Sequence, residues 1–486
     1  MESLVQALRL SKAPKIAFVG AGGKTTALFT LARQLVGMGK NQETSSKQNT
    51  VLVTTTTHLA TWQTNLADLH IHIGEVAPLP FEEGNIPTGI VLVTGLYAGD
   101  ERMEGLTGPA MKQLWTLTDS QQIPLLIEAD GSRMRPLKAP GEHEPAIPEF
   151  VDSVVVVAGL SALGKPLSME WVFRPEIYAR LSGLLPGEKI STRAIQQVLT
   201  HPEGGLKNIP GYARRIALLN QADTAELRHE ADQMVRGILK QYHAVVLASL
   251  GKGDNSPALV QREKMLQIVS PGEASPEAAI YSIHESVAGI ILAAGGSKRL
   301  GQPKQMIPWR GHPLVWHVAK TALAAGLDPV IVVTGAYTDQ VEAALKGLPV
   351  TVLFNQAWEM GQSTSLRVGL RSVPENTGGA LFFLADQPMV SVELVYRLVK
   401  EHSSTLAPLV APLVNGSRAN PVLFDRVTFG DLLALEGDVG GRVLFGDSYH
   451  YPVTWVSWEY PNLLLDIDTP EDYERFRQME GTEGVK

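Results

Sequence analysis

A glycine turn followed by basic side chains lies between Leu292 and Lys304, in the sequence LAAGGSKRLGQPK. Gly295 and Gly296 have no side chain, so the backbone there could approach a phosphate closely and turn its amide N–H groups toward it. Arg299 could hold phosphate oxygens at two points, and Lys304 would add a compact positive charge. The alternative is an ordinary turn with cations in solvent. The cations beside the glycines favour a phosphate-binding turn.

Three aspartates further along the chain could hold Mg²⁺ against such phosphates. Asp386 ends the apolar run FFLAD, and Asp466 and Asp468 stand just before the helix-start sequence TPED. Carboxylate oxygens are the ligands that Mg²⁺ prefers. Asp386 with either Asp466 or Asp468 is therefore the predicted metal site, and the spacing does not decide between the two. An aspartate shortly before Pro388 is also common as a turn or cap residue, so that alternative stays open.

The first half holds a second pattern of strand, glycine turn and helix, IAFVGAGGKTTALFTLA over residues 16–32. Its GKTT run matches the end of the phosphate-loop pattern G-x-x-x-x-G-K-[ST], but the first glycine of that pattern would fall on Phe18, so this loop is shorter. Lys24 would reach outer phosphates, and a threonine after it could bind Mg²⁺. The alternative is a turn with Lys24 in solvent. The residues expected to bind a nucleotide here are Gly22, Gly23, Lys24, Thr25 and Thr26.

Acidic and charged residues follow two later strands of the first half. Glu128 and Asp130 end the apolar run LLIEADG, and Asp130 is the predicted metal ligand. The Pro-rich, charged stretch 128–148 has the composition of an active-site loop. Its candidates for substrate contact are Lys138, Glu142, His143 and Glu144. LLNQAD (218–223) resembles the Asn-Lys-x-Asp motif of GTPases with Gln221 in place of the lysine, and Asp223 could equally cap a helix.

Short β-branched runs alternate with helix-length segments throughout both halves, which is typical of parallel sheets covered by helices on both faces. The predicted fold class is α/β, with two doubly wound domains. Residues 1–268 would form a P-loop-like domain, 269–286 a linker rich in turn formers, and 287–486 a second domain with its own first strand.

The composition excludes several classes of protein. A chain of 486 residues is too long for one core, and 44% hydrophobic with 19% charged residues indicates a globular protein. The net charge of −8 argues against nucleic-acid or membrane coating, and the absence of cysteine excludes disulfides, thiolate metal sites and cysteine nucleophiles. The opening residues lack a secretory signal and no apolar stretch is long enough for a membrane span, so a cytoplasmic protein is expected.

The second half resembles the molybdenum cofactor cytidylyltransferase family. The glycine turn is similar to the family signature LAAGxSxRMGxxK, with Leu300 in place of the methionine, and a second departure is Ala419, where related proteins often have glycine before the residue matching Asn420. Further matches follow in the family's order: NQAWEMGQSTSLRVGL (355–370), DQP (386–388), RANPVLF (418–424), GDVGGR (437–442) and DIDTPED (466–472). The resemblance implies a GT-A/Rossmann-like nucleotidyltransferase domain. The implied reaction transfers CMP from CTP to molybdopterin, releases pyrophosphate and forms the cytosine dinucleotide cofactor.

The resemblance also implies roles for particular residues. Arg299, Lys304 and Asp386 would be catalytic, and Asn420 and Arg442 would contact the acceptor. Ser363 and Ser365 would lie near the nucleotide or the acceptor, with capping of the following helix as the alternative, and the alternative for Arg442 is a surface residue. The residues implied to bind the nucleotide are Leu292, Ala293, Ala294, Gly295, Gly296, Gly361 and Ser363.

Most of residues 1–260 is similar to accessory proteins linked to selenium-dependent molybdenum hydroxylases, through VGAGGKTT, TTTTH (54–58) and the stretch 128–148. That resemblance implies binding of ATP or GTP and a molybdenum hydroxylase apoenzyme as client. Two other functions stay open. One is nucleotidyl transfer to another phosphorylated acceptor, such as a sugar phosphate, and the other is a non-catalytic molybdenum cofactor chaperone.

Overall fold

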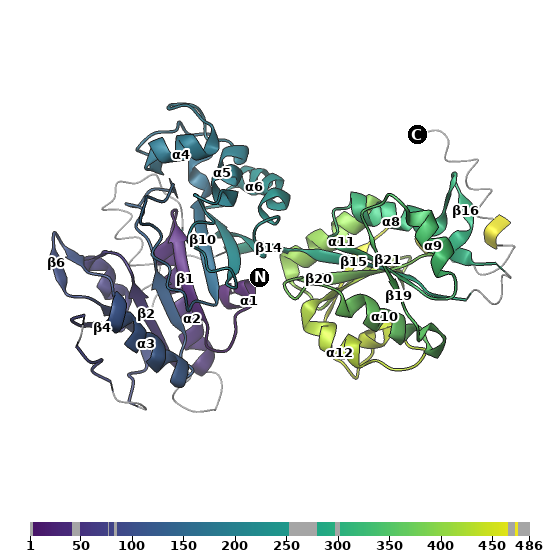
Figure 1. The fold of residues 1–486 in the computed structure, drawn as a ribbon, viewed down its shortest axis with the longest axis horizontal. Coiled ribbons are helices and arrows are strands. Elements are labelled where there is room, and N and C mark those ends of the chain that lie inside the picture. The colour runs from purple at the N-terminus through teal and green to yellow at the C-terminus, as the bar shows by residue number, and fades with distance from the viewer. Residues whose placement is uncertain are drawn as a thin grey trace. The chain divides into compact units, whose positions relative to one another are not determined.

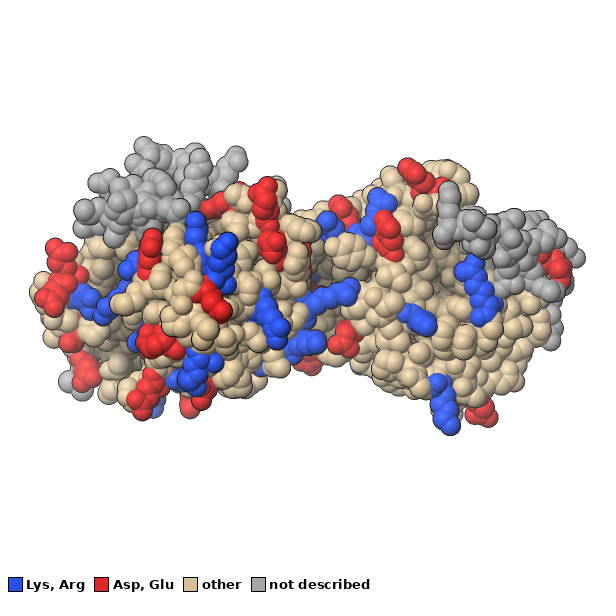
Figure 2. All heavy atoms as spheres, turned by 90° about the horizontal axis from the view of Figure 1, so that it is seen from above, with Lys and Arg blue, Asp and Glu red and all other residues tan. Residues whose placement is uncertain are grey.

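The computed structural model describes residues 3–40, 49–75, 77–81, 85–251, 279–296, 302–464 and 472–474. The chain forms two compact units, Met1–His284 and Glu285–Lys486, each built on its own β-sheet (Figure 1). On the face of the first unit drawn in Figure 2, basic and acidic side chains are interspersed. Within the described ranges, no helix combines the length and the apolar character that crossing a membrane requires.

The first unit contains a nine-stranded sheet of order β14-β13-β12-β10-β1-β8-β2-β5-β4, in which every pair from β13 to β4 is parallel. All seven residues of β10 are buried, so both faces of the sheet are covered there. The strands are β1 (Lys15–Gly20), β2 (Thr50–Thr55), β4 (Leu69–His72), β5 (Gly89–Thr94), β8 (Leu125–Glu128), β10 (Ser153–Gly159), β12 (Arg214–Asn220), β13 (Ala244–Ser249) and β14 (Ala279–Glu285).

Helices and two small sheets complete the first unit. The helices are α1 (Leu4–Leu8), α2 (Lys24–Lys40), α3 (Gly108–Ser120), α4 (Pro175–Ser182), α5 (Thr192–Thr200) and α6 (Ala225–Ile238). The small sheets pair β9 (Leu137–Lys138) with β11 (Val172–Phe173), and β3 (Leu59–Ala60) with β7 (Arg102–Met103) and β6 (Tyr97–Gly99).

The second unit contains an eight-stranded sheet of order β19-β18-β15-β20-β23-β21-β22, with β24 also paired to β21. Its strands are β15 (Val287–Ala293), β18 (Val330–Thr334), β19 (Thr351–Phe354), β20 (Gly379–Leu384), β21 (Leu409–Val414), β22 (Ser417–Arg418), β23 (Val422–Asp425) and β24 (Val453–Ser457). A hairpin of β16 (Pro308–Trp309) and β17 (His312–Pro313) lies outside this sheet.

Helices cover both faces of this second sheet, above and below it in Figure 1. One core contains Ile291 of β15 and residues of α8 (Leu314–Ala324), α9 (Thr338–Leu345) and α11 (Val392–Thr405). The other contains Ile290 with residues of α10 (Gln362–Arg371) and α12 (Phe429–Ala434). Successive strand residues point to opposite faces, so neighbours in one apolar run supply two cores. The α/β prediction is confirmed.

The second sheet is mixed, whereas the sequence analysis expected parallel strands. β23 runs antiparallel to both β20 and β21, and β22 is antiparallel to β21. The turn between β21 and β22 has positive φ at Asn415 (49°) and Gly416 (77°), the conformation of a tight hairpin turn. Because two reversals restore the direction, β20, β21 and β24 run the same way and end at one edge with β15.

The stretch 269–286 was expected to be a linker, but most of its second half is a β-strand. β14 occupies Ala279–Glu285 as the edge strand beside β13, while residues 269–278 lie outside the described ranges. Its Ile280 and Ile283 are buried. This short strand was not predicted because turn-forming residues dominate the earlier part of the stretch.

We expect Ile283→Ala to lower the free energy of unfolding of the full chain by about 2–5 kcal/mol, because Ile283 is 1% exposed and the truncation leaves a cavity. Chemical denaturation measures this change. Met169→Ala, at a side chain that is 73% exposed, should change stability by less than about 0.5 kcal/mol. Equal, negligible effects of both substitutions would mean that this segment is a linker after all.

Candidate functional site

A cavity of about 520 Å³ opens in the second unit at the carboxyl ends of β15 and β20. This size is ordinary for a small-molecule site, and the end of a parallel sheet is where such folds bind ligands. The structure brings together in its lining these residues expected from the sequence: Leu292, Ala293, Ala294, Gly295, Gly296, Lys304, Gly361, Ser365 and Asp386.

Hydrogen bonds from side chains to its carbonyl groups hold the glycine turn after β15. Gln305, which is buried, donates from Nε2 to the Ala293 and Gly295 carbonyls at 3.2 and 3.4 Å. Tyr337 donates to the Gly296 carbonyl at 3.3 Å. The N–H groups of Gly295 and Gly296 find no acceptor within the described residues. Amide donors left available beside a cavity suit an anionic ligand.

Two side chains of this turn region were not expected from the sequence. Gln305 directly follows Lys304 and ties the segment carrying that lysine to the glycine turn. The indole of Trp358 lines the cavity and would lie 3.1 Å from a Cβ at position 296. A side chain at position 296 would therefore press on the neighbouring ring, which favours glycine there. No local spacing in the sequence connects position 358 with 296.

Gly361 marks where a second loop crosses the first. Its φ is 117°, and a Cβ there would lie 2.5 Å from the carbonyl of Gly437. Ser363 is fully buried and donates to that carbonyl at 2.7 Å, so it fixes the loop and does not line the cavity. Neither Ser363 nor Ser365 caps α10: Asp438 accepts from the Gln362 N–H at 3.2 Å instead.

Asp386 and Asp438 both line the cavity. Carboxylates are hard oxygen donors, so the chemistry of this pair fits Mg²⁺. Among the residues that the structure describes, no three acidic or histidine side chains gather as a complete metal site. Two of the expected ligands, Asp466 and Asp468, lie outside those residues, as does Arg299.

The two residues expected to contact the acceptor lie apart from the cavity lining. Arg442 is exposed on the turn Gly441–Phe445, and Asn420 is half-buried and precedes a cis Pro421.

The glycine loop of the first unit packs against its neighbours. The N–H groups of Ala21 and Gly22 donate to the carbonyls of Val157 (2.8 Å) and Arg135 (3.1 Å). Gly22 has a φ of 84°, and a Cβ there would lie 2.3 Å from the Gly159 nitrogen. In this conformation protein carbonyls therefore occupy the N–H groups of Ala21 and Gly22.

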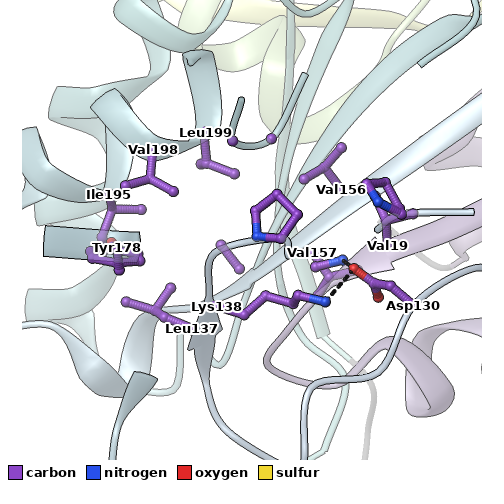
Figure 3. Close-up of a pocket in the computed structure, with 16 residues that line it drawn as sticks. Val19, Asp130, Leu137, Lys138, Val156, Val157, Tyr178, Ile195, Val198 and Leu199 are labelled. Carbon is purple, nitrogen blue, oxygen red and sulfur yellow. Dashed lines mark hydrogen bonds and ion pairs between the residues drawn. The ribbon is translucent and has the colours of Figure 1, made fainter. Parts of the chain in front are cut away.

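Lys24 is 3% exposed, so the alternative that it lies in solvent is wrong. Its ammonium donates to the Gly20 carbonyl at 2.8 Å and lies 3.2 Å from Asp130 and 3.9 Å from Glu128. Asp130, expected to bind metal, instead pairs with two lysines: its other oxygen lies 2.8 Å from Lys138. Figure 3 shows Lys138 pointing at Asp130.

The ion pairs continue beyond Lys138. Its ammonium lies 2.8 Å from the carboxylate of Glu144, which lies 2.5 Å from the guanidinium of Arg174. Burial alone would raise the pKa of Glu144, but hydrogen bonds from Arg174 and Lys138 outweigh it and lower the pKa to about 2. Burial raises the pKa of Glu128 more than Lys24 lowers it. We call the six side chains Lys24, Glu128, Asp130, Lys138, Glu144 and Arg174 the charged chain.

A small cavity of about 40 Å³ lies beside the charged chain. Figure 3 shows Tyr178 of α4 and Ile195, Val198 and Leu199 of α5 across it from Lys138. Its walls are mostly apolar, so the ion pairs between Lys138 and Asp130 are shielded from water.

Other expected residues of the first unit lie elsewhere. Thr25 donates to Glu128 at 2.9 Å, which brings it to the charged chain. Glu142 and His143 are exposed. Asp223 does not cap the following helix, because Thr224 accepts the Leu227 N–H there.

Comparisons with known proteins give each half a separate match. Residues 16–176 match the family model described as YqeC protein, and residues 289–452 match the MobA-like NTP transferase domain. The first half is 33% identical over 265 residues to the uncharacterized protein YqeC of Escherichia coli (strain K12), covering 54% of this chain and 96% of that protein.

The relatives of the second half include one named as an oxidoreductase and one named as a cytidylyltransferase. It is 34% identical over 197 residues to nicotine blue oxidoreductase of Paenarthrobacter nicotinovorans, covering 39% of this chain and 95% of that protein. It is 26% identical over 187 residues to molybdenum cofactor cytidylyltransferase of Escherichia coli (strain K12), covering 38% of this chain and 92% of that protein.

We expect Glu144→Gln to lower the free energy of unfolding at pH 7. Lowering the pKa of Glu144 from 4.5 to about 2 corresponds to roughly 3 kcal/mol, which we reduce to about 2 kcal/mol because the side chain is partly exposed. The folded-state pKa is depressed, so this stabilisation is full above pH 4.5 and is lost as the pH falls toward 2.

Denaturation of wild-type and variant protein between pH 7 and pH 3 measures the difference. The gap between the two should shrink as the pH falls through this window. Glu142→Gln, at an exposed neighbour, is the control and should show no such gap. A gap that stays constant with pH would contradict the ion pairing assigned to Glu144.

Proposed function

The chain belongs to the YqeC family through its first half and to the MobA-like NTP transferases through its second, and from this we propose that the second half is a CTP:molybdopterin cytidylyltransferase. It transfers CMP from CTP to the phosphate of molybdopterin, releases pyrophosphate and forms the cytosine dinucleotide cofactor of molybdenum hydroxylases. The relative named molybdenum cofactor cytidylyltransferase supports this substrate.

The observation that carries the proposal is the meeting of three kinds of group in the cavity of the second unit. Gly295 and Gly296, which carry amide donors, the basic residue Lys304 and the acidic residue Asp386 all line it. Such a set suits a triphosphate, because catalysis of this transfer consists mainly of positioning and charge stabilisation.

In the proposed reaction an oxygen of the acceptor phosphate attacks the α-phosphorus of CTP. The bond between the α-phosphorus and the bridging oxygen breaks, and pyrophosphate leaves with that oxygen. The glycine N–H groups hold phosphate oxygens, and Lys304 and Arg299 neutralise charge on the departing pyrophosphate. Asp386 and Asp438, with Asp466 or Asp468, would hold Mg²⁺, which supplies further positive charge to the phosphates when bound.

The first half is proposed to bind ATP or GTP at residues 22–26. Its proposed client protein is a molybdenum hydroxylase apoenzyme. Lys24 would have to leave Asp130 before it could reach a phosphate, and Asp130 and Glu128 would then be available for Mg²⁺. Lys138 would contact the substrate of that half. The similarity to YqeC over most of that protein's length supports a separate accessory role.

We expect pyrophosphate release when CTP, Mg²⁺ and molybdopterin are added to the full chain, and tighter binding of CTP than of GTP or UTP by calorimetry. Asp386→Asn should lower the rate of release at least about a hundredfold, because a group that stabilises transition-state charge is lost. Asp339→Asn, at an exposed aspartate of α9, should leave the rate unchanged.

Three results would contradict the assignment. Release with a sugar phosphate but not with molybdopterin would indicate another acceptor, and binding of molybdopterin without release would indicate a chaperone. Oxidation or reduction of nicotine blue, without pyrophosphate release, would place the second half with the relative named nicotine blue oxidoreductase.

A further inference from the structure

The loops that follow β1, β10, β12 and β13 lie next to one another at the carboxyl edge of the first sheet. β1 divides this sheet: β8, β2, β5 and β4 lie on one side of it, and β10, β12 and β13 on the other. Open α/β sheets bind ligands in the crevice where the strand order changes direction in this way. Glu128 and Asp130, which hold Lys24, lie at the end of β8. The base of a nucleotide bound at residues 22–26 would therefore extend to the other side, over β10 and β12.

Asn220 ties the glycine loop to the ends of two strands on that side. It is the last residue of β12, and its side chain is buried. Its Nδ2 donates to the Gly22 carbonyl at 2.8 Å, and its Oδ1 accepts the N–H of Leu250, the residue directly after β13, at 3.0 Å. Both polar groups of this buried amide are hydrogen-bonded, so the side chain fixes the relative positions of the three segments. The loops after β12 and β13 are therefore held beside the proposed phosphate site.

The loop after β12 is also packed onto the end of β10. Gln221, the residue that follows Asn220, has a φ of 62°, so the chain turns there in the left-handed conformation. Its Oε1 accepts the Ser161 hydroxyl at 2.7 Å and would lie 2.2 Å from a Cβ at position 159, where β10 ends in glycine. Contacts with β10, β13 and the glycine loop thus position the segment that leads to Asp223.

Asp223 brings a carboxylate to this edge of the sheet. It is half-buried, and its Oδ1 accepts a hydrogen bond from the hydroxyl of Ser249, the last residue of β13. A carboxylate has about four acceptor sites, so it can accept N–H groups of a ligand while Ser249 fixes its orientation. β12 lies two strands from β1, which corresponds to about 10 Å. The ribose of a nucleotide spans such a gap between its phosphates and its base.

We propose that Asp223 recognises the base in the nucleotide site of the first half, and that this base is guanine. The N1–H and the 2-amino group of guanine are two donors side by side, and one carboxylate can accept both. Adenine carries an acceptor at N1 and no amino group at C2, so it would leave the carboxylate without these hydrogen bonds. This inference rests on the proposed nucleotide binding by the first half, and it selects GTP over ATP.

The test measures binding of four triphosphates to the full chain: GTP, ATP, inosine triphosphate and xanthosine triphosphate. Each displaces GTP that carries a fluorescent label on its ribose, with Mg²⁺ present and with saturating CTP to occupy the second unit. GTP should bind at least about tenfold more tightly than ATP. Inosine triphosphate lacks the 2-amino group and should bind about tenfold more weakly than GTP, because one charge-assisted hydrogen bond is lost.

Asp223→Asn should reverse the preference among these nucleotides. An amide offers one acceptor and one donor, and xanthine has an oxygen at C2 where guanine has the amino group. The variant should therefore bind GTP about tenfold more weakly than the wild type and xanthosine triphosphate more tightly. Asparagine can still accept the Ser249 hydroxyl, so the unfolding temperature should stay the same. Glu226→Gln, at an exposed carboxylate in the first turn of α6, removes the same charge and should leave the order of affinities unchanged.

The results distinguish this inference from the proposed function. If the wild type binds ATP as tightly as GTP, the guanine site is wrong while nucleotide binding stands. The guanine site is also wrong if Asp223→Asn keeps the wild-type preference for GTP over xanthosine triphosphate. If no other triphosphate binds once CTP is saturating, the proposed nucleotide binding by the first half fails, and the inference fails with it.

Discussion

The direction of the strands determines what the second unit can bind. β15 and β20 are parallel neighbours, so the glycine turn after one and Asp386 after the other meet at one edge. The reversal through β23 then returns β21 and β24 to that direction, which brings Arg418 to the same edge. The backbone donors of the glycine turn and the guanidinium of Arg418, more than a hundred residues apart in the chain, therefore lie at one edge together with Asp386. The hydrogen-bond register of the sheet places them there.

In the first unit the organising interaction is the buried carboxylate of Asp130. It accepts the Gly20 N–H at 2.9 Å and pairs with Lys24 and Lys138. Breaking a buried pair leaves an uncompensated charge, which is strongly unfavourable. A ligand that draws Lys24 away leaves Lys138 to balance both Asp130 and Glu144, so the remaining carboxylates exceed the remaining ammonium charge. A divalent cation bound together with that ligand would replace the lost positive charge, whereas a bare phosphate would not.

The sequence was most informative where a single segment carried the signal. Continuous apolar runs predicted the α/β fold, and the residues from Leu292 to Gly296 line one cavity because they are consecutive. Features that depend on distant pairings were not predictable. Ser363 is a helix residue whose hydroxyl donates to the Gly437 carbonyl. Arg174 donates to Glu144, 30 residues away in the chain, and the guanidinium of Arg418 lies over the ring of Phe445. β14 was missed because Ile280 and Ile283 are its only buried hydrophobic residues and turn formers precede it.

β14 ends at Glu285 and β15 begins at Val287, so Ser286 alone separates the last strand of one sheet from the first strand of the other. The two halves match separate families, yet no spacer stands at their junction. A crossover that exchanged one half and left both strands intact would have to fall at this single residue. The point at which the two halves can be joined or separated is therefore almost fixed.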